Sequence, residues 1–315
     1  MDEFSFISKY LTPLSGSGSF DLTDDIALLD TQYNYGFSTD TMVENIHFLP
    51  NIKPDDLAFR LISVSISDLI CKALTPKFYA LNLTFSKHIE EKWLDNFSLG
   101  LKKAQKYYNI SLLGGDTTIT DKNMVLTATI FGAKTEKVIL RSNAKINDDI
   151  WVTGNIGDAF LGLEIASKKL LLDNEYLLAK YNHPTCHQNL QKFLLEFANS
   201  ALDISDGLIQ DLEQLCSASN CGALVNYDLI PLSKIAQKIL KKNPKYKEKI
   251  INSGDDYEIL FTANPRNKED IIKFSKETKT KISYIGKIKA ENSVDILDIN
   301  NQPISVKNLG YKHSF

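Results

Sequence analysis

The feature that most constrains this chain is a set of six short segments in which aspartate stands beside serine, threonine or glycine. Each segment alone is ordinary turn or helix-cap chemistry. Together, and without a matching set of basic residues, they are either six solvated turns or one site built from the whole chain. The segments are Thr23-Asp24-Asp25, Ser38-Thr39-Asp40-Thr41, Ser67-Asp68, Gly114-Gly115-Asp116-Thr117, Asp203-Ile204-Ser205-Asp206-Gly207 and Gly254-Asp255-Asp256.

One of these carboxylates is predicted to lie inside an apolar helix. Pro54 followed by two acidic residues favours a helix start, and the apolar pattern continues to about Leu74. Asp68 falls in the apolar second half of this helix. An unpaired charge in such surroundings is very costly, so Asp68 needs a partner. Lys72, one turn later, is the simplest partner, and a bound cation is the alternative.

If the six segments converge, their repulsion has to be neutralised by cations. Hydroxyl and carboxylate oxygens favour Mg²⁺ over zinc, and the four cysteines show no metal-binding spacing. A site with several Mg²⁺ ions suits a polyphosphate substrate. Arg141, one of only three arginines, is a candidate phosphate partner. The residues alone thus indicate an ATP-using enzyme without a Walker loop.

Composition sets the class of protein. A length of 315 residues allows two domains, and the order of predicted strands and helices indicates an α+β fold. We place the boundary in the polar stretch before residue 144, giving domains 1–143 and 144–315. A net charge of -3 argues against a nucleic-acid partner. The acidic N-terminus and the lack of a long apolar run predict a cytoplasmic protein with no membrane partner.

Three local predictions bear on the site. A short buried strand is expected at 110–113, opening onto a turn where Gly114 and Gly115 let the backbone approach a ligand. Helices are expected at 187–200 and, near the N-terminus, at 4–11.

Several motifs together resemble the thiamine-monophosphate kinase family. They include Phe37-Ser-Thr-Asp-Thr-Met-Val, Asn45-Ile-His-Phe-Leu-Pro, Leu113-Gly-Gly-Asp-Thr-Thr, Ala201-Leu-Asp-Ile-Ser-Asp-Gly-Leu and Asp256-Tyr-Glu-Ile. The resemblance is collinear over nearly the whole chain. The family shares a superfamily with aminoimidazole ribonucleotide synthetase, selenophosphate synthetase and a hydrogenase-maturation protein. The resemblance implies an N-terminal domain that forms a homodimer by joining sheets, and a C-terminal α/β domain that covers the nucleotide.

The resemblance also implies an activity and a set of site residues. The activity is ATP-dependent phosphorylation of thiamine monophosphate to thiamine diphosphate, with several Mg²⁺ ions. The implied metal ligands are Asp25, Ser38, Thr39, Asp40, Asp68, Asp116, Asp203 and Asp206. The implied nucleotide contacts are Gly115, Asp116, Arg141 and Ser205, and the implied substrate contacts are His47, Asp255 and Tyr311. Asp40, Asp116 and Asp206 are the expected catalytic residues.

The chain departs from the family pattern at a few positions. Asp21-Leu-Thr-Asp-Asp stands where the family usually has Gly-Ile-Gly-Asp-Asp, Ala73-Leu74 replaces Gly-Ala, and Asp255 replaces a glutamate. Two other readings remain: a sister enzyme of the superfamily with another substrate, and a non-catalytic module that binds Mg-nucleotide. Turnover of ATP with thiamine monophosphate separates the three.

Overall fold

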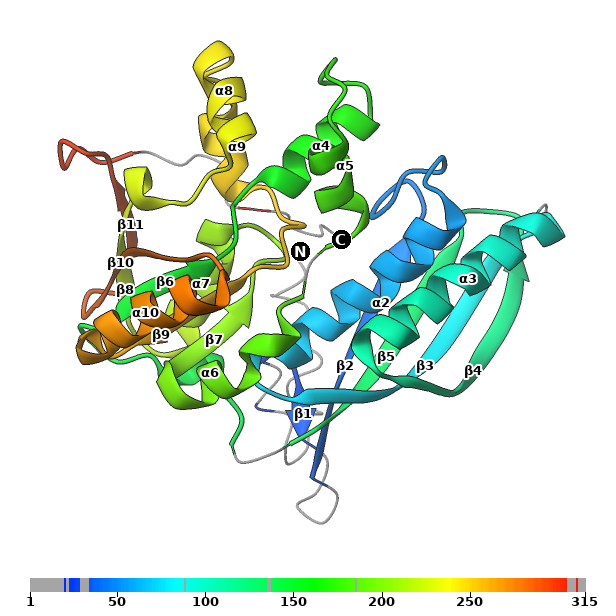
Figure 1. Ribbon diagram of the computed structural model, residues 1–315, viewed down its shortest axis with the longest axis horizontal. Coiled ribbons are helices and arrows are strands. Elements are labelled where there is room, and N and C mark those ends of the chain that lie inside the picture. The colour runs from blue at the N-terminus through cyan, green and yellow to red at the C-terminus, as the bar shows by residue number, and fades with distance from the viewer. Residues whose placement is uncertain are drawn as a thin grey trace.

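The computed structural model describes residues 20, 23–28, 34–87, 89–134, 137–184, 186–304 and 310. The helix expected at 4–11, together with Asp21 and Tyr311, lies outside these residues. The described chain forms two mixed sheets with helices, which confirms the α+β prediction (Figure 1). Among the described helices, none has the length and apolar character that crossing a membrane requires.

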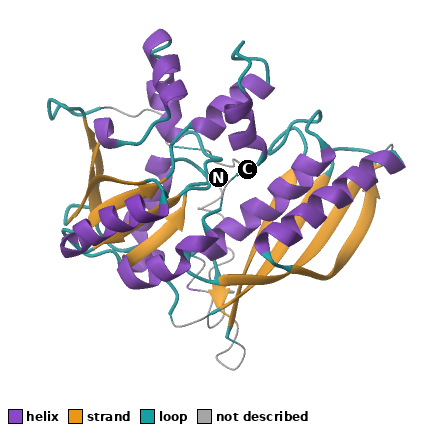
Figure 2. Cartoon of the chain, viewed as in Figure 1, coloured by secondary structure: helices purple, strands orange, loops and turns teal. Residues whose placement is uncertain are grey.

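The first sheet has the order β1-β2-β5-β3-β4 in the described chain. Its strands are β1 (Ala27–Leu28), β2 (Tyr35–Val43), β3 (Thr75–Ser86), β4 (Ser111–Thr120) and β5 (Val125–Ala133). The two helices α2 (Pro54–Cys71) and α3 (Glu91–Tyr108) cover one face of this sheet (Figure 2). Threonines occupy part of the other face, where Thr39 bonds Thr129 and Thr41 bonds Thr127. These four side chains are exposed or half-buried, so this face is open in one protomer.

Helix α2 is the central element of the molecule. Thirteen of its 18 residues are buried, because α2 contacts the first sheet and α3 on one side and elements of the second half of the chain on the other. A helix buried all round carries apolar residues on every face, which is the pattern between Leu57 and Cys71. The polar residues that interrupt this pattern are therefore the ones whose burial needs an explanation.

The strand predicted at 110–113 is present as the start of β4 (Ser111–Thr120), but its predicted length and its burial beyond Ile110 were wrong. Strand β4 continues through both glycines to Thr120, and it is exposed along nearly its whole length. It pairs with β3 alone, in parallel, and forms the edge of the sheet. The apolar residues Leu112 and Leu113 suggested burial, yet they are 48% and 62% exposed. A sequence pattern does not distinguish an apolar edge from an apolar interior.

The second sheet has the order β11-β8-β10-β6-β9-β7 within the described ranges. Its strands are β6 (Asp149–Thr153), β7 (Ala198–Asp203), β8 (Gly222–Asn226), β9 (Ile259–Ala263), β10 (Ile282–Lys289) and β11 (Val294–Leu297). Both faces of this sheet are covered. Successive side chains of a strand point to opposite faces, and here they pack into two different hydrophobic cores. Trp151 and Phe261 join the core that contains α2, whereas Ile150 and Leu260 join a core of the second half alone.

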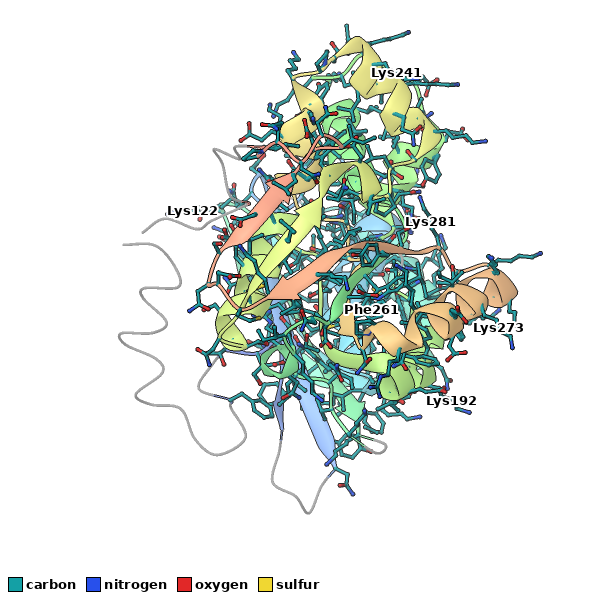
Figure 3. The ribbon with its side chains drawn as sticks, turned by 90° about the vertical axis from the view of Figure 1, so that its left-hand side faces the viewer. Lys122, Lys192, Lys241, Phe261, Lys273 and Lys281 are labelled. Carbon is teal, nitrogen blue, oxygen red and sulfur yellow. The ribbon has the colours of Figure 1, made fainter. Side chains whose placement is uncertain are left out.

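The helices of the second half are α4 (Asp158–Ala166), α5 (Glu175–Asn182), α6 (Gln191–Phe197), α7 (Leu208–Ala218), α8 (Lys234–Lys242), α9 (Tyr246–Asn252) and α10 (Lys268–Thr278). The helix expected at 187–200 ends earlier, because residues 198–200 belong to β7. Lys192, Lys241 and Lys273 point away from the body of the molecule, while Phe261 lies inside it (Figure 3).

Candidate functional site

Three of the six predicted segments supply carboxylates that meet between the two halves of the chain. Asp40 comes from β2, Asp68 from α2 and Asp203 from the end of β7. The charges of Asp40 and Asp203 raise the pKa of Asp68, and the charge of Asp203 raises that of Asp40, so the three carboxylates are neighbours. Ser38, two residues before Asp40 and therefore on the same face of β2, donates a hydrogen bond to Asp68. The convergence that the sequence predicted is therefore observed for these three segments.

Burial and mutual repulsion disturb the protonation of this trio. Burial, with the negative charge of Asp203, raises the pKa of Asp40 to about 7. Burial, with Asp40 and Asp203, raises the pKa of Asp68 as well, and burial raises that of Asp203. One oxygen of Asp40, Oδ2, is buried without a hydrogen-bond partner among the described residues. Neighbouring carboxylates that resist ionisation together, with one buried oxygen that lacks a donor, are typical of a site that takes a hard cation.

Asp24 and Asp25 lie next to this trio but have partners of their own. The Lys72 ammonium is 2.7 Å from Asp25 Oδ2 and 3.2 Å from Asp24 Oδ1. Arg141 pairs with the other oxygen of Asp25, and its backbone N–H donates to Asp24 Oδ2 at 2.9 Å. One oxygen of Asp25, one of Asp203 and the Cys71 sulfur lie within 4.8 Å of one another. Lys72 thus pairs with Asp24 and Asp25, and not with Asp68 as the helical spacing suggested.

The loop after β7 carries the next predicted residues. Asp206 and Gly207 donate their backbone N–H groups to Asp211 Oδ2, both at 3.1 Å, and Asp206 accepts from Gln210 at 3.0 Å. Burial and the charge of Asp206 raise the pKa of Asp211. Asp211 lies three residues after the motif that ends at Leu208, and its function of holding this loop was not predicted.

The predicted substrate residue Asp255 is held by a buried arginine. Arg60 lies on α2 with a side chain 1% exposed, and its guanidinium is 2.6 Å from Asp255 Oδ1. Arg60 also donates to the carbonyl of Tyr181 and stacks over its ring, 4.5 Å from the centroid. Asp255 adopts φ 72°, and its N–H donates to the carbonyl of Ser205 at 2.9 Å. This hydrogen bond directly links Asp255, the predicted substrate contact, to Ser205, the predicted nucleotide contact. Sequence reasoning missed Arg60, although its rarity in a lysine-rich chain was a usable signal.

Other predicted residues lie away from the trio within one protomer. Thr39 points to the opposite sheet face from its neighbours in β2, and Asp116 is exposed on β4. The cross-strand path from Asp40 runs through Ala128 and Leu81 to Gly115, so Asp116 is about three strand spacings, roughly 14 Å, from Asp40. His47 is half-buried in the turn after β2, where Val43 N–H donates to its Nδ1 at 3.0 Å.

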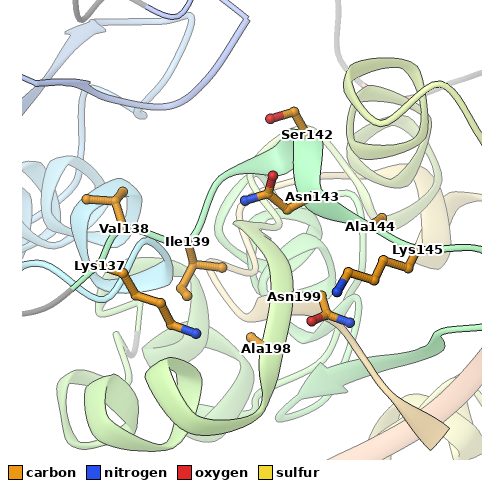
Figure 4. A pocket seen from close by; sticks show the side chains of 9 residues that line it. All are labelled: Lys137, Val138, Ile139, Ser142, Asn143, Ala144, Lys145, Ala198 and Asn199. Carbon is orange, nitrogen blue, oxygen red and sulfur yellow. The ribbon is translucent and has the colours of Figure 1, made fainter.

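A cavity of about 510 Å³ lies at the linker between the halves and contains no carboxylate among its lining residues (Figure 4). It is lined by residues 137–139, 142–145 and 198–199. The convergence of buried carboxylates, and not this cavity, therefore defines the candidate site.

The two-sheet fold and this site define a class. Residues 23–133 match the family model described as "AIR synthase related protein, N-terminal domain", and residues 145–299 match the corresponding C-terminal domain. The structure of AaThiL complexed with AMPPCP and TMP is similar in fold, with a TM-score of 0.86 and 24% identity, covering 99% of this chain and 97% of that one.

Two curated relatives narrow the class. The thiamine-monophosphate kinase of Buchnera aphidicola subsp. Schizaphis graminum is 35% identical over 99% of this chain and 98% of its own length. That of Haemophilus influenzae is 36% identical over 91% of this chain and 89% of its own. The chain belongs to the thiamine-monophosphate kinase family.

Proposed function

We propose that this chain transfers the terminal phosphoryl group of ATP to a phosphate oxygen of thiamine monophosphate, giving thiamine diphosphate and ADP. Membership of the family supplies the reaction. The observation on this chain that carries it is the convergence of Asp40, Asp68 and Asp203 from both domains. A cluster of this kind repels a polyphosphate unless cations lie between them.

We infer that Mg²⁺ occupies this cluster during the reaction. The fit rests on the buried, unpartnered oxygen of Asp40 and on the raised pKa values of Asp40 and Asp68. Asp40, Asp68 and Asp203 would hold the ions, with Ser38 as a further oxygen. When bound, Mg²⁺ supplies neutralisation of phosphate charge during phosphoryl transfer. The protein's own contribution is to place the two phosphates against each other and to hold Asp255 for the substrate.

We assign Gly115, Asp116 and Thr39 to a site shared between two copies of the chain. Strand β4 is an exposed edge, and Ile119 on it is 69% exposed. An unpaired apolar edge is a template for association, and the adjacent open sheet face carries the exposed threonines. A homodimer that joins these surfaces brings residues of β4 to the other copy. Ser205, Asp206, Arg141, His47 and Tyr311 keep their proposed nucleotide, metal and substrate contacts.

The test is mass spectrometry of reactions that contain the purified chain, ATP and thiamine monophosphate, with Mg²⁺ or with excess EDTA. We expect thiamine diphosphate only when Mg²⁺ is present. Formation of ADP only with another acceptor from a panel of phosphorylated and carbonyl substrates would identify a sister enzyme. Tight ATP binding with no product from any acceptor would identify a binding module. Full activity in EDTA would refute the magnesium proposal.

A further inference from the structure

A lysine lies fully buried at the acidic site. The Lys72 side chain has no exposed surface, and its backbone caps the end of α2, where its N–H bonds to the carbonyl of Ile70. The ammonium has three acceptors: Asp25 Oδ2 at 2.7 Å, Asp24 Oδ1 at 3.2 Å and the carbonyl of Ala201 at 2.6 Å. An ammonium has three protons to donate, so this group is fully satisfied.

The oxygens of Asp24 and Asp25 are correspondingly used. Arg141 contacts the second oxygen of Asp25, and its N–H contacts the second oxygen of Asp24. The two carboxylates carry two negative charges, and the two basic side chains carry two positive ones. This pair of aspartates is therefore neutral as it stands. The side chains of both aspartates are only 4% exposed, so water contributes little to their screening.

Asp40, Asp68 and Asp203 are in the opposite condition. None of these three carboxylates forms an ion pair with a basic side chain in the described part of the chain, and Asp40 Oδ2 has no hydrogen-bond donor there. The charges of Lys72 and Arg141 also act on Asp203, but both side chains form their ion pairs with Asp24 and Asp25, so the trio has no paired cation of its own among the described residues. A divalent ion at Asp25 would instead meet an ammonium already within contact distance, and like charges a few ångströms apart repel strongly in a buried site.

We propose that Lys72 is a built-in cation that stands in the place of a divalent ion at Asp25. In this chain Asp25 is then not a ligand of Mg²⁺, contrary to the family resemblance, and the metal ions gather at Asp40, Asp68 and Asp203. Lys72 and Arg141 fix the position of the Asp24-Asp25 segment without any metal. The inference rests on the proposed magnesium site and changes its membership.

The test counts Mn²⁺ ions by electron paramagnetic resonance and isothermal titration calorimetry, in the presence of a non-hydrolysable ATP analogue. Asp25→Asn should bind as many Mn²⁺ ions as the wild type, although more weakly, because the change leaves one positive charge of Lys72 and Arg141 uncompensated beside the ions. Asp68→Asn should bind about one ion fewer. Circular dichroism and melting curves verify that both variants are folded.

A second variant tests the lysine directly. Lys72→Met leaves two buried carboxylates short of a cation, so it should gain about one Mn²⁺ ion per chain and a larger rise in Tm with Mn²⁺ than the wild type. Lys103→Met is the matched control, because Lys103 pairs with Asp55 at 2.7 Å but is 59% exposed. That control should change neither quantity.

The outcomes separate this inference from the proposed function. Loss of an ion in Asp25→Asn, with normal binding in the wild type, would overturn the inference alone. An unchanged ion count in Lys72→Met would overturn the claim that the ammonium replaces an ion. Absence of Mn²⁺ binding to the wild type with nucleotide would refute the magnesium site itself, and the inference with it.

Discussion

At the scale of single residues, the buried carboxylates of the site are costly to ionise in the absence of a cation. Asp40 has a pKa near 7 in the folded chain, because burial and Asp203 oppose its ionisation. The same group ionises near 3.8 when unfolded. Between these values the folded state holds a proton that the unfolded state has released. Without metal, stability contributed by this group is therefore present at low pH and is lost as the pH rises toward about 7.

The Asp40→Asn variant should change both the pH dependence of stability and the turnover rate. In EDTA the wild-type Tm should fall as the pH rises from about 4 to about 7, and the variant should lose the part of that decrease that Asp40 contributes, because its amide does not ionise. Turnover should fall by about 100-fold or more, as when a charge-stabilising group is removed. Thermal melts across this pH range and steady-state rates measure the two effects. Superimposable pH profiles of the wild type and the variant would show that Asp40 does not contribute to the decrease in Tm.

The Arg60–Asp255 pair gives a second prediction. Asp255→Ala leaves a fully buried guanidinium without its carboxylate, which should cost about 1–3 kcal/mol of unfolding free energy, since the carboxylate itself is partly exposed. It should also raise KM for thiamine monophosphate more than KM for ATP. Urea unfolding and kinetics measure these effects.

The control for this pair is the double variant Arg60→Met with Asp255→Ala. Replacing both partners removes the unpaired charge, so the double variant should recover part of the lost stability while KM for thiamine monophosphate stays high. Equal stability of the single and double variants would show that the guanidinium does not depend on Asp255.

At the scale of elements, the glycines of β4 serve two different needs. A Cβ on Gly115 would lie 1.7 Å from the carbonyl oxygen of Leu81 on β3, whereas a Cβ on Gly114 meets nothing within 4 Å. Both have φ near +150°, a conformation that favours glycine. Gly115 is therefore required by the pairing with β3, and Gly114 leaves room for an approaching group.

This contrast defines a matched pair of variants. Gly115→Ala should lower Tm clearly, because a backbone clash is added to the unfavourable φ, and Gly114→Ala should lower it by the smaller amount that the φ alone costs. Differential scanning calorimetry of both variants separates the two contributions. Equal losses would show that β3 and β4 can move apart without cost.

Elements are also the scale at which the sequence was most informative. The helix expected from Pro54 to about Leu74 was confirmed as α2, which ends at Cys71. The sequence did not predict that β4 is an exposed edge or that Lys72 turns toward Asp24 and Asp25. Local spacing describes neighbours on one element, whereas these two facts depend on which distant strands lie beside it. The grouping of Asp40, Asp68 and Asp203 was predictable because their charges had to be compensated somewhere.

At the scale of the whole molecule, the first sheet is covered by helices on one face only, whereas the second is covered on both. An open face beside an apolar edge predicts association of two chains. If the proposed dimer forms through this edge, Ile119→Lys should shift the purified protein from dimer to monomer in sedimentation equilibrium. It should also reduce turnover, because Asp116 would lose the shared site that we assign to it. Ser111→Ala, on the same strand, is the control. A dimer that survives Ile119→Lys would place the interface elsewhere.

Helix α2 carries both Arg60, which pairs with Asp255, and Asp68, which belongs to the trio that we propose binds Mg²⁺. These residues are eight positions apart, or about 12 Å along the axis. The length of α2 therefore fixes the distance between the two ends of the site that we assign to the substrate and to the phosphates. Inserting a single residue between them would add about 1.5 Å and turn one end by about 100° relative to the other. Substitutions can therefore change the side chains of α2 far more easily than an insertion or deletion can change the spacing between Arg60 and Asp68.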